Sequence, residues 1–324
     1  MNQRRKKVKI LITGGAGFIG SRLAIESLKR GYEVIVYDNL STGNTNNISS
    51  CLANENFSLV QGNVLEDKDG LEDLIKNVDV VAHMAATVGV KNIIDCPHDL
   101  IMNNINSTYK ILNLCDIYNK KVFIASSSEV YGKLNKVPFR EDDDCLYGNS
   151  NNLRWSYGAS KLTNEMLALS FYKNKGLEVY IGRFFNIIGA GQNGDSGMVV
   201  PRFINWAKQN HPIKIHGDGK QVRTFTYVEE ACKSVIDLIN SEKGIGQIIN
   251  IAGKATISIE DLALTIKRIT NSESEIQYDT VEYERDFEDI PIRIPSVEKL
   301  HSVIGWTPEM CIEDIIKTII FKQH

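Results

Sequence analysis

Two side chains four residues apart, Tyr157 and Lys161, have the types and the spacing for acid–base chemistry at an alcohol. Residues four apart on a helix share one face, so both side chains project toward the same point. An ammonium ion beside a phenol stabilises the phenolate, and we therefore expect Lys161 to lower the pKa of Tyr157 and make it a usable general base or acid. A serine-rich segment, residues 126–128, follows a predicted strand upstream. This pattern predicts proton transfer at a hydroxyl group.

A glycine-rich turn near the N-terminus predicts a dinucleotide site. Residues 13–20 read TGGAGFIG, directly follow a predicted strand and open a predicted helix. Gly14 permits the tight turn, Gly17 lets the backbone approach a pyrophosphate, and Gly20 lets the helix pack closely on the strand. The phosphates would lie at the positive N-terminus of the helix. Asp38 ends the second predicted strand and is placed to accept hydrogen bonds from the adenosine ribose, and its charge would repel a 2′-phosphate, which favours NAD over NADP.

The elements that must position these groups alternate along the first half of the chain. Short β-branched runs predict strands and amphipathic stretches predict helices, a pattern typical of repeated βα units on a parallel sheet. The predicted strands are 8–12, 33–37, 57–60, 78–82, 121–125 and 177–184, and the helices are 18–30, 71–76, 99–118 and 157–173. Right-handed crossovers then give an α/β fold, a Rossmann-type doubly wound parallel sheet with helices on both faces.

The second half begins after a segment rich in glycine and asparagine, residues 189–197. It mixes short strands with helices predicted at 201–209, 228–240 and 259–269. We interpret residues 1–185 as an NAD-binding core and residues 186–324 mainly as a smaller α/β substrate-binding lid, with segments interleaved with the core.

The net charge and the cysteine content limit the kinds of partner and cofactor that we expect. A net charge of -3 gives no reason to expect nucleic acid or an acidic membrane surface, and the basic run at residues 4–7 is typical of a solvated tail. Six cysteines without short spacings predict neither a metal site nor a disulfide framework. No apolar run approaches the roughly 20 residues that span a bilayer. We therefore expect a cytoplasmic protein with reduced thiols.

Two further segments, HMAA at residues 83–86 and GWTP at 305–308, complete a pattern that extends over nearly the whole chain. With the glycine turn and Tyr157–Lys161, the sequence resembles the extended short-chain dehydrogenase/reductases of the NAD-dependent epimerase/dehydratase family, which act on nucleotide-diphospho-sugars. The resemblance implies a tightly held NAD that takes a hydride from the sugar C4 while Tyr157 takes the O4 proton. It also implies that Ser127 hydrogen-bonds O4 and that Lys161 holds the nicotinamide ribose.

The binding residues follow from the turn, Asp38 and this resemblance. Asn63 would read the adenine edge, with a simple turn role as the alternative. The predicted cofactor site comprises Gly14, Gly17, Phe18, Ile19, Gly20, Asp38, Asn39, Asn63, Val64, Ala85, Ala86, Tyr157 and Lys161.

On the substrate side, the resemblance implies Asn186 beside the phosphates, Arg223 on the diphosphate and Val200 along the base. A guanidinium fork suits a phosphate pair, although Arg223 could instead form a surface ion pair.

The 4-keto sugar formed by oxidation can be re-reduced as a C4 epimer, lose water from C6, or lose carbon dioxide if C6 is a carboxylate. Glu129 is informative here, because UDP-glucuronate decarboxylases resemble this chain in carrying Ser-Glu-Val-Tyr-Gly, whereas simple 4-epimerases have a small residue at that position. The 4,6-dehydratases share the Glu but usually have Asp where Ser128, a predicted substrate-binding residue, stands. Arg154-Trp155-Ser156-Tyr157 is similar to a decarboxylase motif, and Arg293 falls where such enzymes place an Arg near the sugar carboxylate. Glu129 and Arg293 could instead be structural partners in a polar loop.

We therefore hypothesise a UDP-glucuronate (UDP-uronate) decarboxylase, with Ser127, Glu129, Tyr157, Lys161 and Arg293 as its catalytic residues. A UDP-sugar 4-epimerase is the first alternative and an NDP-sugar 4,6-dehydratase the second. A non-catalytic NAD-binding protein is a different class of hypothesis, and the intact Ser127, Tyr157 and Lys161 argue against it. The resemblance also implies a homodimer formed through helices 99–118 and 157–173.

Overall fold

The computed structural model describes residues 7–66, 70–89, 95–192, 198–279 and 290–321. Residues 4–6 of the basic run and residues 193–197 of the glycine- and asparagine-rich segment therefore lie outside the described residues. Within the described part, no helix is both long enough and apolar enough to cross a membrane.

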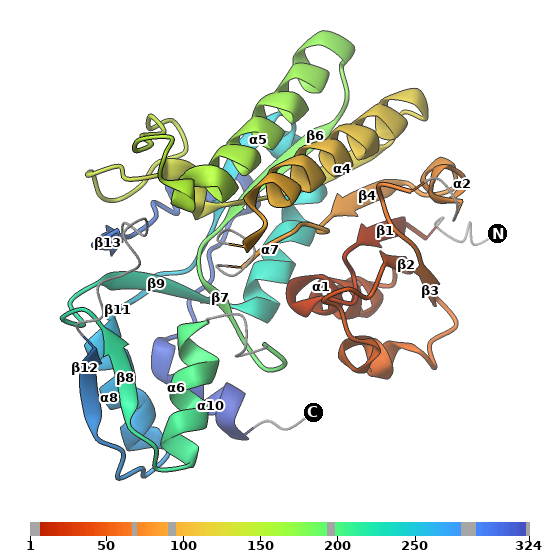
Figure 1. Cartoon of the computed structure of the whole chain (residues 1–324). Helices are drawn as coiled ribbons and strands as arrows, with labels where there is room; N and C mark the ends of the chain where they lie inside the picture. Colours follow the sequence, from red (N-terminus) through yellow and green to blue (C-terminus); the bar gives the residue numbers. More distant parts are fainter. Residues whose placement is uncertain (1–6, 67–69, 90–94, 193–197, 280–289, 322–324) are drawn as a thin grey trace.

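A seven-stranded parallel sheet forms the centre of the molecule, in the order β10-β6-β5-β4-β1-β2-β3 (Figure 1). Strands such as Lys9–Thr13, KILIT, are nearly continuous apolar runs because both faces of the sheet are covered. The strands are β1 (Lys9–Thr13), β2 (Glu33–Asp38), β3 (Phe57–Gln61), β4 (Val80–His83), β5 (Lys121–Ser127), β6 (Val179–Phe184) and β10 (Gln247–Ile251). All six predicted strands are present within two residues of their predicted ends, and the order confirms the doubly wound fold class.

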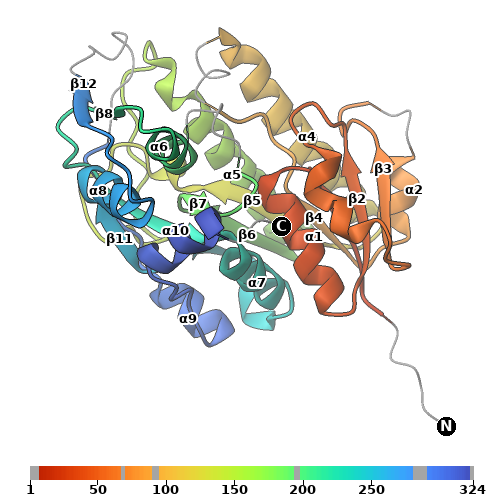
Figure 2. The same cartoon turned by 90° about the horizontal axis from the view of Figure 1, so that it is seen from below.

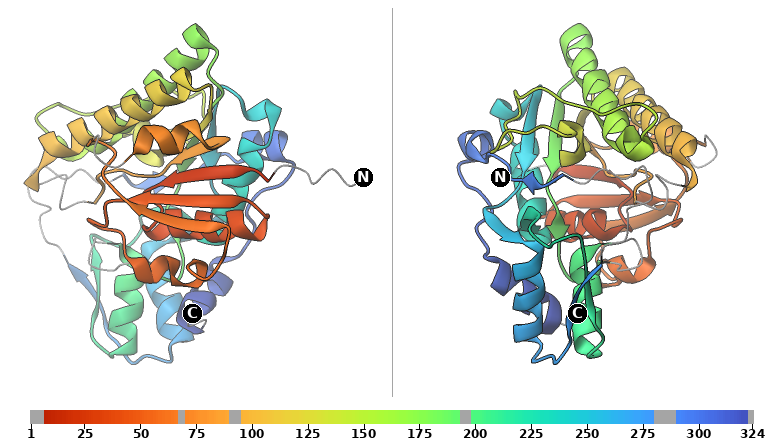
Figure 3. Two further views of the ribbon diagram at one scale, coloured as in Figure 1. Left: turned by 90° about the vertical axis from the view of Figure 1, so that its right-hand side faces the viewer. Right: turned by 60° about the vertical axis from the view of Figure 1, so that its left-hand side comes forward.

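Helices cover both faces of this sheet, as Figure 3 shows from two sides. On one face, α1 (Phe18–Lys29) and α7 (Val228–Ile239) share an apolar cluster with β1, β2 and β4. On the other, α2 (Leu71–Lys76), α4 (Pro97–Ile117) and α5 (Ser156–Lys175) share a second cluster. Each of these helices matches a predicted one, with ends shifted by at most two residues.

The seventh strand of the sheet comes from the second half of the chain. β10 pairs in parallel with β6, so that Asn250 lies opposite Arg183. The sequence pattern does not predict this strand, because its five residues are separated from β6 by more than sixty residues of mixed structure. As a result, both β10 and α7 belong to the central layers of the molecule.

The remaining segments form a smaller layer of helices and short strands (Figure 2). Its apolar side chains, among them Phe203, Leu262 and Ile315, join the same cluster as one face of the sheet. Its helices are α6 (Val199–Lys208), α8 (Ile259–Ile269), α9 (Glu298–Ile304) and α10 (Ile312–Phe321). Its strands are β7 (Ile187–Ile188), β8 (Ile213–His216), β9 (Val222–Tyr227), β11 (Ala255–Ser258), β12 (Ile276–Asp279) and β13 (Ile292–Arg293).

Polar residues gather at one edge of the sheet. Because the strands are parallel, their carboxyl ends place Thr13, Asp38, His83 and Ser127 along that same edge. The chain order reverses between β1 and β4, which is the position at which open α/β sheets bind ligands.

Candidate active site

The glycine turn between β1 and α1 is closely packed. Gly14 has a φ of +69°, a conformation that favours glycine, and a Cβ there would lie 2.7 Å from the Ala85 backbone. A Cβ on Gly20 would lie 2.2 Å from the Gly14 carbonyl oxygen. Helix α1 begins after Gly17 without a side-chain cap, so its first backbone N–H groups have no partner from that residue. The turn therefore offers the donors and the close backbone approach that a pyrophosphate requires.

Asp38 is fixed at the end of β2. Its side chain is 6% exposed, Oδ2 accepts a hydrogen bond from Ala16 N at 2.9 Å, and Oδ1 accepts one from Leu40 N at 2.8 Å. A carboxylate has about four acceptor positions, so these two bonds orient the group without exhausting it. The geometry fits an acceptor for the two hydroxyls of a ribose.

The other predicted cofactor residues surround this turn. Phe18 and Ile19 form the first turn of α1 and are partly exposed. Ala85 and Ala86 follow β4, and Ala85 N donates to Thr13 Oγ1 at 3.3 Å, which ties that loop to the glycine turn.

Residues after β2 and β3 complete the adenosine side. The side-chain oxygen of Asn39 accepts a hydrogen bond from Ser41 N, and that of Asn63 accepts one from Leu65 N at 3.1 Å. Asn63 thus makes the local contact of a turn residue, which was the alternative to an adenine contact. Val64 is buried in the apolar cluster below.

Lys161 is buried one helical turn beyond Tyr157 on α5. Its Nζ donates a hydrogen bond to the carbonyl oxygen of Ala125 at 2.8 Å, which ties α5 to the carboxyl end of β5. Burial lowers the pKa of Lys161 to about 8, and the carboxylate of Glu165 opposes that shift. Lys161 can therefore change its protonation state near neutral pH.

The pKa of Tyr157 is raised above its usual value, whereas the sequence predicts that it is lowered. Burial raises it, the negative charge of Glu129 raises it further, and a hydrogen bond from Ser127 opposes the shift. The expected lowering by Lys161 is absent from these influences because the ammonium is directed to the Ala125 carbonyl. The structure nevertheless places Ser127 close enough to Tyr157 to influence its pKa.

Glu129 lies between two arginines. Its Oε1 is 2.6 Å from Arg293 Nη1, and its Oε2 is 2.8 Å from Arg154 Nη1. Burial alone would raise the pKa of Glu129, but Arg293 and Arg154 lower it to about 2. Arg293 also lies 3.5 Å from Ser128 Oγ. The carboxylate stays ionised, and the three side chains together carry one net positive charge.

The sequence does not predict a role for Arg154 in the site. It belongs to a 3₁₀ turn, Leu153–Trp155, immediately before α5, and its side chain is 7% exposed. The Arg-Trp-x-Tyr motif was the available signal, but spacing alone gave no indication that Arg154 reaches the carboxylate of Glu129.

Ser128 directly follows β5, whereas the other predicted substrate residues lie on the smaller layer or at its border with β6. Asn186 has a φ of +35° and donates from Nδ2 to Thr224 O at 2.8 Å, which links the end of β6 to β9. Arg223, on β9, is the register partner of Arg293 on β13 and donates to Pro291 O at 3.2 Å. Val200 is buried at the start of α6.

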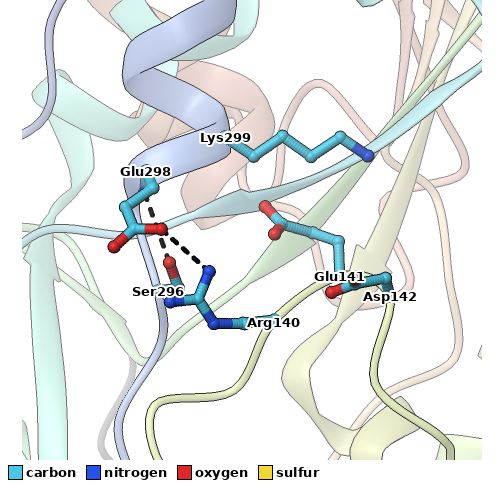
Figure 4. Close-up of a pocket in the computed structure, with 6 residues that line it drawn as sticks. All are labelled: Arg140, Glu141, Asp142, Ser296, Glu298 and Lys299. Atoms are coloured by element: carbon cyan, nitrogen blue, oxygen red, sulfur yellow. Dashed lines mark hydrogen bonds and ion pairs between the residues drawn. The ribbon is translucent and has the colours of Figure 1, made fainter.

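Two of the cavities formed by the described residues lie outside the Tyr157 site. The larger, about 960 Å³, lies between α1 and α6 and includes Val200 and Gly189 in its lining. The smaller, about 260 Å³, is lined by side chains of both charges from the segments at 140–142 and 296–299 (Figure 4). Among the described residues, no group of three or more His, Cys, Asp or Glu side chains is placed to hold a metal ion.

Comparison with known proteins agrees with this arrangement. The sequence model of the GDP-mannose 4,6 dehydratase family matches residues 11–319. The chain belongs to this family. It is 41% identical over 317 residues to a UDP-N-acetyl-alpha-D-glucosaminuronate decarboxylase of Bacillus cytotoxicus, covering 97% of each chain. It is 31% identical over 318 residues to UDP-glucuronic acid decarboxylase 1 of Danio rerio, covering 97% of this chain and 72% of the other.

Solved structures give the same assignment. The UDP-glucuronic acid 4-epimerase of Bacillus cereus, in complex with UDP-glucuronic acid and NAD, superposes with a TM-score of 0.86 at 28% identity, covering 96% of this chain and 97% of that one. The predicted resemblance is therefore confirmed: this member of the family is an NAD-dependent enzyme of nucleotide-sugar metabolism. The closed glycine turn and the oriented Asp38 fit that cofactor.

Proposed function

We propose that this enzyme decarboxylates a UDP-uronate through a 4-keto sugar. A carboxylate at C6 becomes a β-keto acid when C4 is oxidised. The C5–C6 bond then breaks to release carbon dioxide, and the enolate that remains takes a proton at C5 from solvent before hydride returns to C4 and Tyr157 returns the proton to O4. Bound NAD supplies the removal and return of hydride at C4. The protein side chains hold the sugar, move the O4 proton and bind the carboxylate.

The observation that carries the proposal is the Arg154–Glu129–Arg293 bridge beside Tyr157. Two guanidiniums and one carboxylate leave one positive charge in a buried place, and a sugar carboxylate would neutralise it. A neutral hydroxymethyl group, as in UDP-glucose, would offer that charge no carboxylate. The two decarboxylases named above, at 41% and 31% identity, support the same reaction.

Each reacting group then has a definite task. Tyr157 takes the proton from O4, while Ser127 donates a hydrogen bond to the same oxygen and fixes the sugar. Lys161, whose Nζ donates to the Ala125 carbonyl oxygen, holds the nicotinamide ribose. Glu129, ionised by its two arginines, polarises this end of the site, and Arg293 binds the carboxylate before carbon dioxide leaves.

We assign the binding residues in the same way. The glycine turn with Phe18 and Ile19 holds the pyrophosphate of NAD. Asp38 and Asn39 hold the adenosine ribose, Asn63 and Val64 adjoin the adenine, and Ala85 and Ala86 line the path toward the nicotinamide. The smaller layer, mainly residues 186–324, binds the UDP moiety through Asn186, Arg223 and Val200, and Ser128 contacts the sugar.

A homodimer and a cytoplasmic location complete the proposal. Large apolar side chains on α4 and α5 are more than half exposed, namely Met102, Tyr109, Ile117 and Met166, and a second copy of these helices would cover them. All six cysteines are free, as expected in a reducing compartment.

Product analysis tests the reaction directly. The NAD-loaded enzyme is incubated separately with UDP-glucuronate, UDP-N-acetylglucosaminuronate and UDP-glucose, and carbon dioxide and the nucleotide product are measured. Release of carbon dioxide with a UDP-pentose or its acetamido analogue supports decarboxylation. A C4 epimer that retains all its carbon rejects it in favour of a 4-epimerase, and a 4-keto-6-deoxy sugar from UDP-glucose would indicate a dehydratase.

A further inference from the structure

The two arginines that contact Glu129 are held very differently. Arg154 belongs to the 3₁₀ turn that leads into α5, and its guanidinium carbon lies 5.6 Å from the centre of the Trp155 ring. Its backbone N–H donates to Asn152 Oδ1 at 3.0 Å. Arg293 lies on β13, a strand of two residues, beside Arg223. Arg154 is thus fixed to the helix that carries Tyr157, whereas Arg293 belongs to the layer that would hold the nucleotide.

The carboxylate of Glu129 uses one oxygen for each arginine. Oε2 lies 2.8 Å from Arg154 Nη1, and Oε1 lies 2.6 Å from Arg293 Nη1. Other groups face Glu129 as well: Tyr157 on α5 and Tyr147 before the 3₁₀ turn both feel its negative charge. If Arg293 turned to another carboxylate, Glu129 would still keep a charged partner on its second oxygen. Glu129 is largely buried, with 19% of its side chain exposed, and leaving such a carboxylate without any partner is unfavourable.

We propose that Arg154 determines specificity for a sugar carboxylate, by holding Glu129 so that Arg293 can pair with the substrate. Two guanidiniums then face two carboxylates, one from the protein and one from the sugar, and the buried charges balance. Arg154 acts through Glu129 and need not touch the sugar. This inference rests on the proposed function, because it assumes that the substrate is a uronate.

Ligand binding separates this role from a structural one. The chain with Tyr157→Phe, loaded with NAD, should turn over at least about 100-fold more slowly, so dissociation constants for UDP-glucuronate, UDP-glucose and UDP can be measured by calorimetry before the substrate is consumed. Adding Arg154→Gln should raise the Kd of UDP-glucuronate about 10-fold or more, because a charge-assisted partner is lost. The Kd values of UDP-glucose and UDP should change less than about 3-fold. Arg154→Lys keeps the charge and should recover part of the loss. Arg140→Gln, at an exposed arginine paired with Glu298, should change none of the three constants.

The inference is overturned if Arg154→Gln weakens UDP-glucuronate and UDP-glucose equally, or if the ratio of their constants does not change. Should Arg154→Gln fail to fold, the same ratio in Arg154→Lys decides, with intermediate discrimination expected and an unchanged ratio counting against the proposal. A wild-type enzyme that releases no carbon dioxide would refute the proposed reaction. The binding ratio would still report whether Arg154 selects for a carboxylate.

Discussion

Lys161 directs its ammonium to the carbonyl oxygen of Ala125, at 2.8 Å, across the junction of α5 and β5. The bond places a charge that is costly to bury beside the last residues of the strand that leads to Ser127. Burial lowers the pKa of Lys161 to about 8, from 10.5 for an ordinary lysine. Burying a lysine at this position therefore lowers the free energy of unfolding.

The pH dependence of stability should reveal that cost. Between about pH 10.5 and pH 8 the unfolded chain binds a proton that the folded chain does not, so stability falls as the pH drops through this window and the loss is complete below it. Lys161→Met removes the effect. The variant should therefore gain stability relative to the wild type as the pH is lowered from 10.5 to 8, as measured by urea unfolding.

The matched control is Lys173→Met, which removes an exposed lysine from the same helix. Its difference from the wild type should not vary across this window. A Lys161→Met difference that is equally flat would show that the folded lysine titrates like an ordinary one.

Tyr157→Phe tests the proton transfer. Loss of the phenol should lower kcat by about 10²–10⁴-fold, the usual contribution of a positioned acid–base group, and change the Kd of UDP within a few-fold. Tyr147→Phe is the control, since that hydroxyl donates to the Val130 carbonyl oxygen on the same side of the site. Undiminished turnover of Tyr157→Phe would refute the mechanism.

Much of this arrangement can be predicted because its determinants are local. The turn at residues 13–20 lies within one stretch of sequence, and Tyr157 and Lys161 lie on one helix. The strands of the first half are also local, since burial on both faces gives each an apolar run. β10 is missed because its place beside β6 depends on the chain returning after the smaller layer has formed.

The charge pattern of the site could not be predicted for the same reason. Glu129, Arg154 and Arg293 come from three separate elements, and no spacing rule relates residues 129 and 293. The pKa of Tyr157 was expected to fall because the i, i+4 rule places Lys161 on its face. The rule does not say where the flexible lysine chain ends, nor that Glu129 lies nearby.

Glu129→Gln should separate binding from turnover. With the Glu129 carboxylate no longer paired with Arg154 and Arg293, the variant should bind UDP-glucuronate more tightly than the wild type, while its decarboxylation falls at least about 100-fold. Kd and carbon dioxide release measure the two effects. Glu66→Gln, at an exposed carboxylate, serves as the control. Weaker binding together with lost turnover would instead indicate that Glu129 only supports the loop.

The buried pair of Arg183 and Glu165 provides the last prediction. Glu165 lies one turn beyond Lys161 and receives Arg183 Nε at 2.9 Å and Nη2 at 2.8 Å, with both side chains at most 3% exposed. Because removing one partner leaves an uncompensated buried charge, Arg183→Met should lower the free energy of unfolding by roughly 3–5 kcal/mol. Replacing both residues with Met should cost less than that single change, because neither charge of the pair is then left unpaired.

An exposed pair supplies the comparison for this measurement. Arg268 and Glu313 make a similar contact at 3.0 Å on the surface, where Arg268→Met should cost no more than about 1 kcal/mol. Denaturant unfolding of Arg183→Met, Glu165→Met, their double variant and Arg268→Met ranks these costs. If the double variant at Arg183 and Glu165 is less stable than either single one, the pair contributes net stability and the desolvation argument fails. If the double variant is instead more stable than the single ones, the pair does not add net stability. Its role is then to hold β6 against the helix that carries Tyr157 and Lys161.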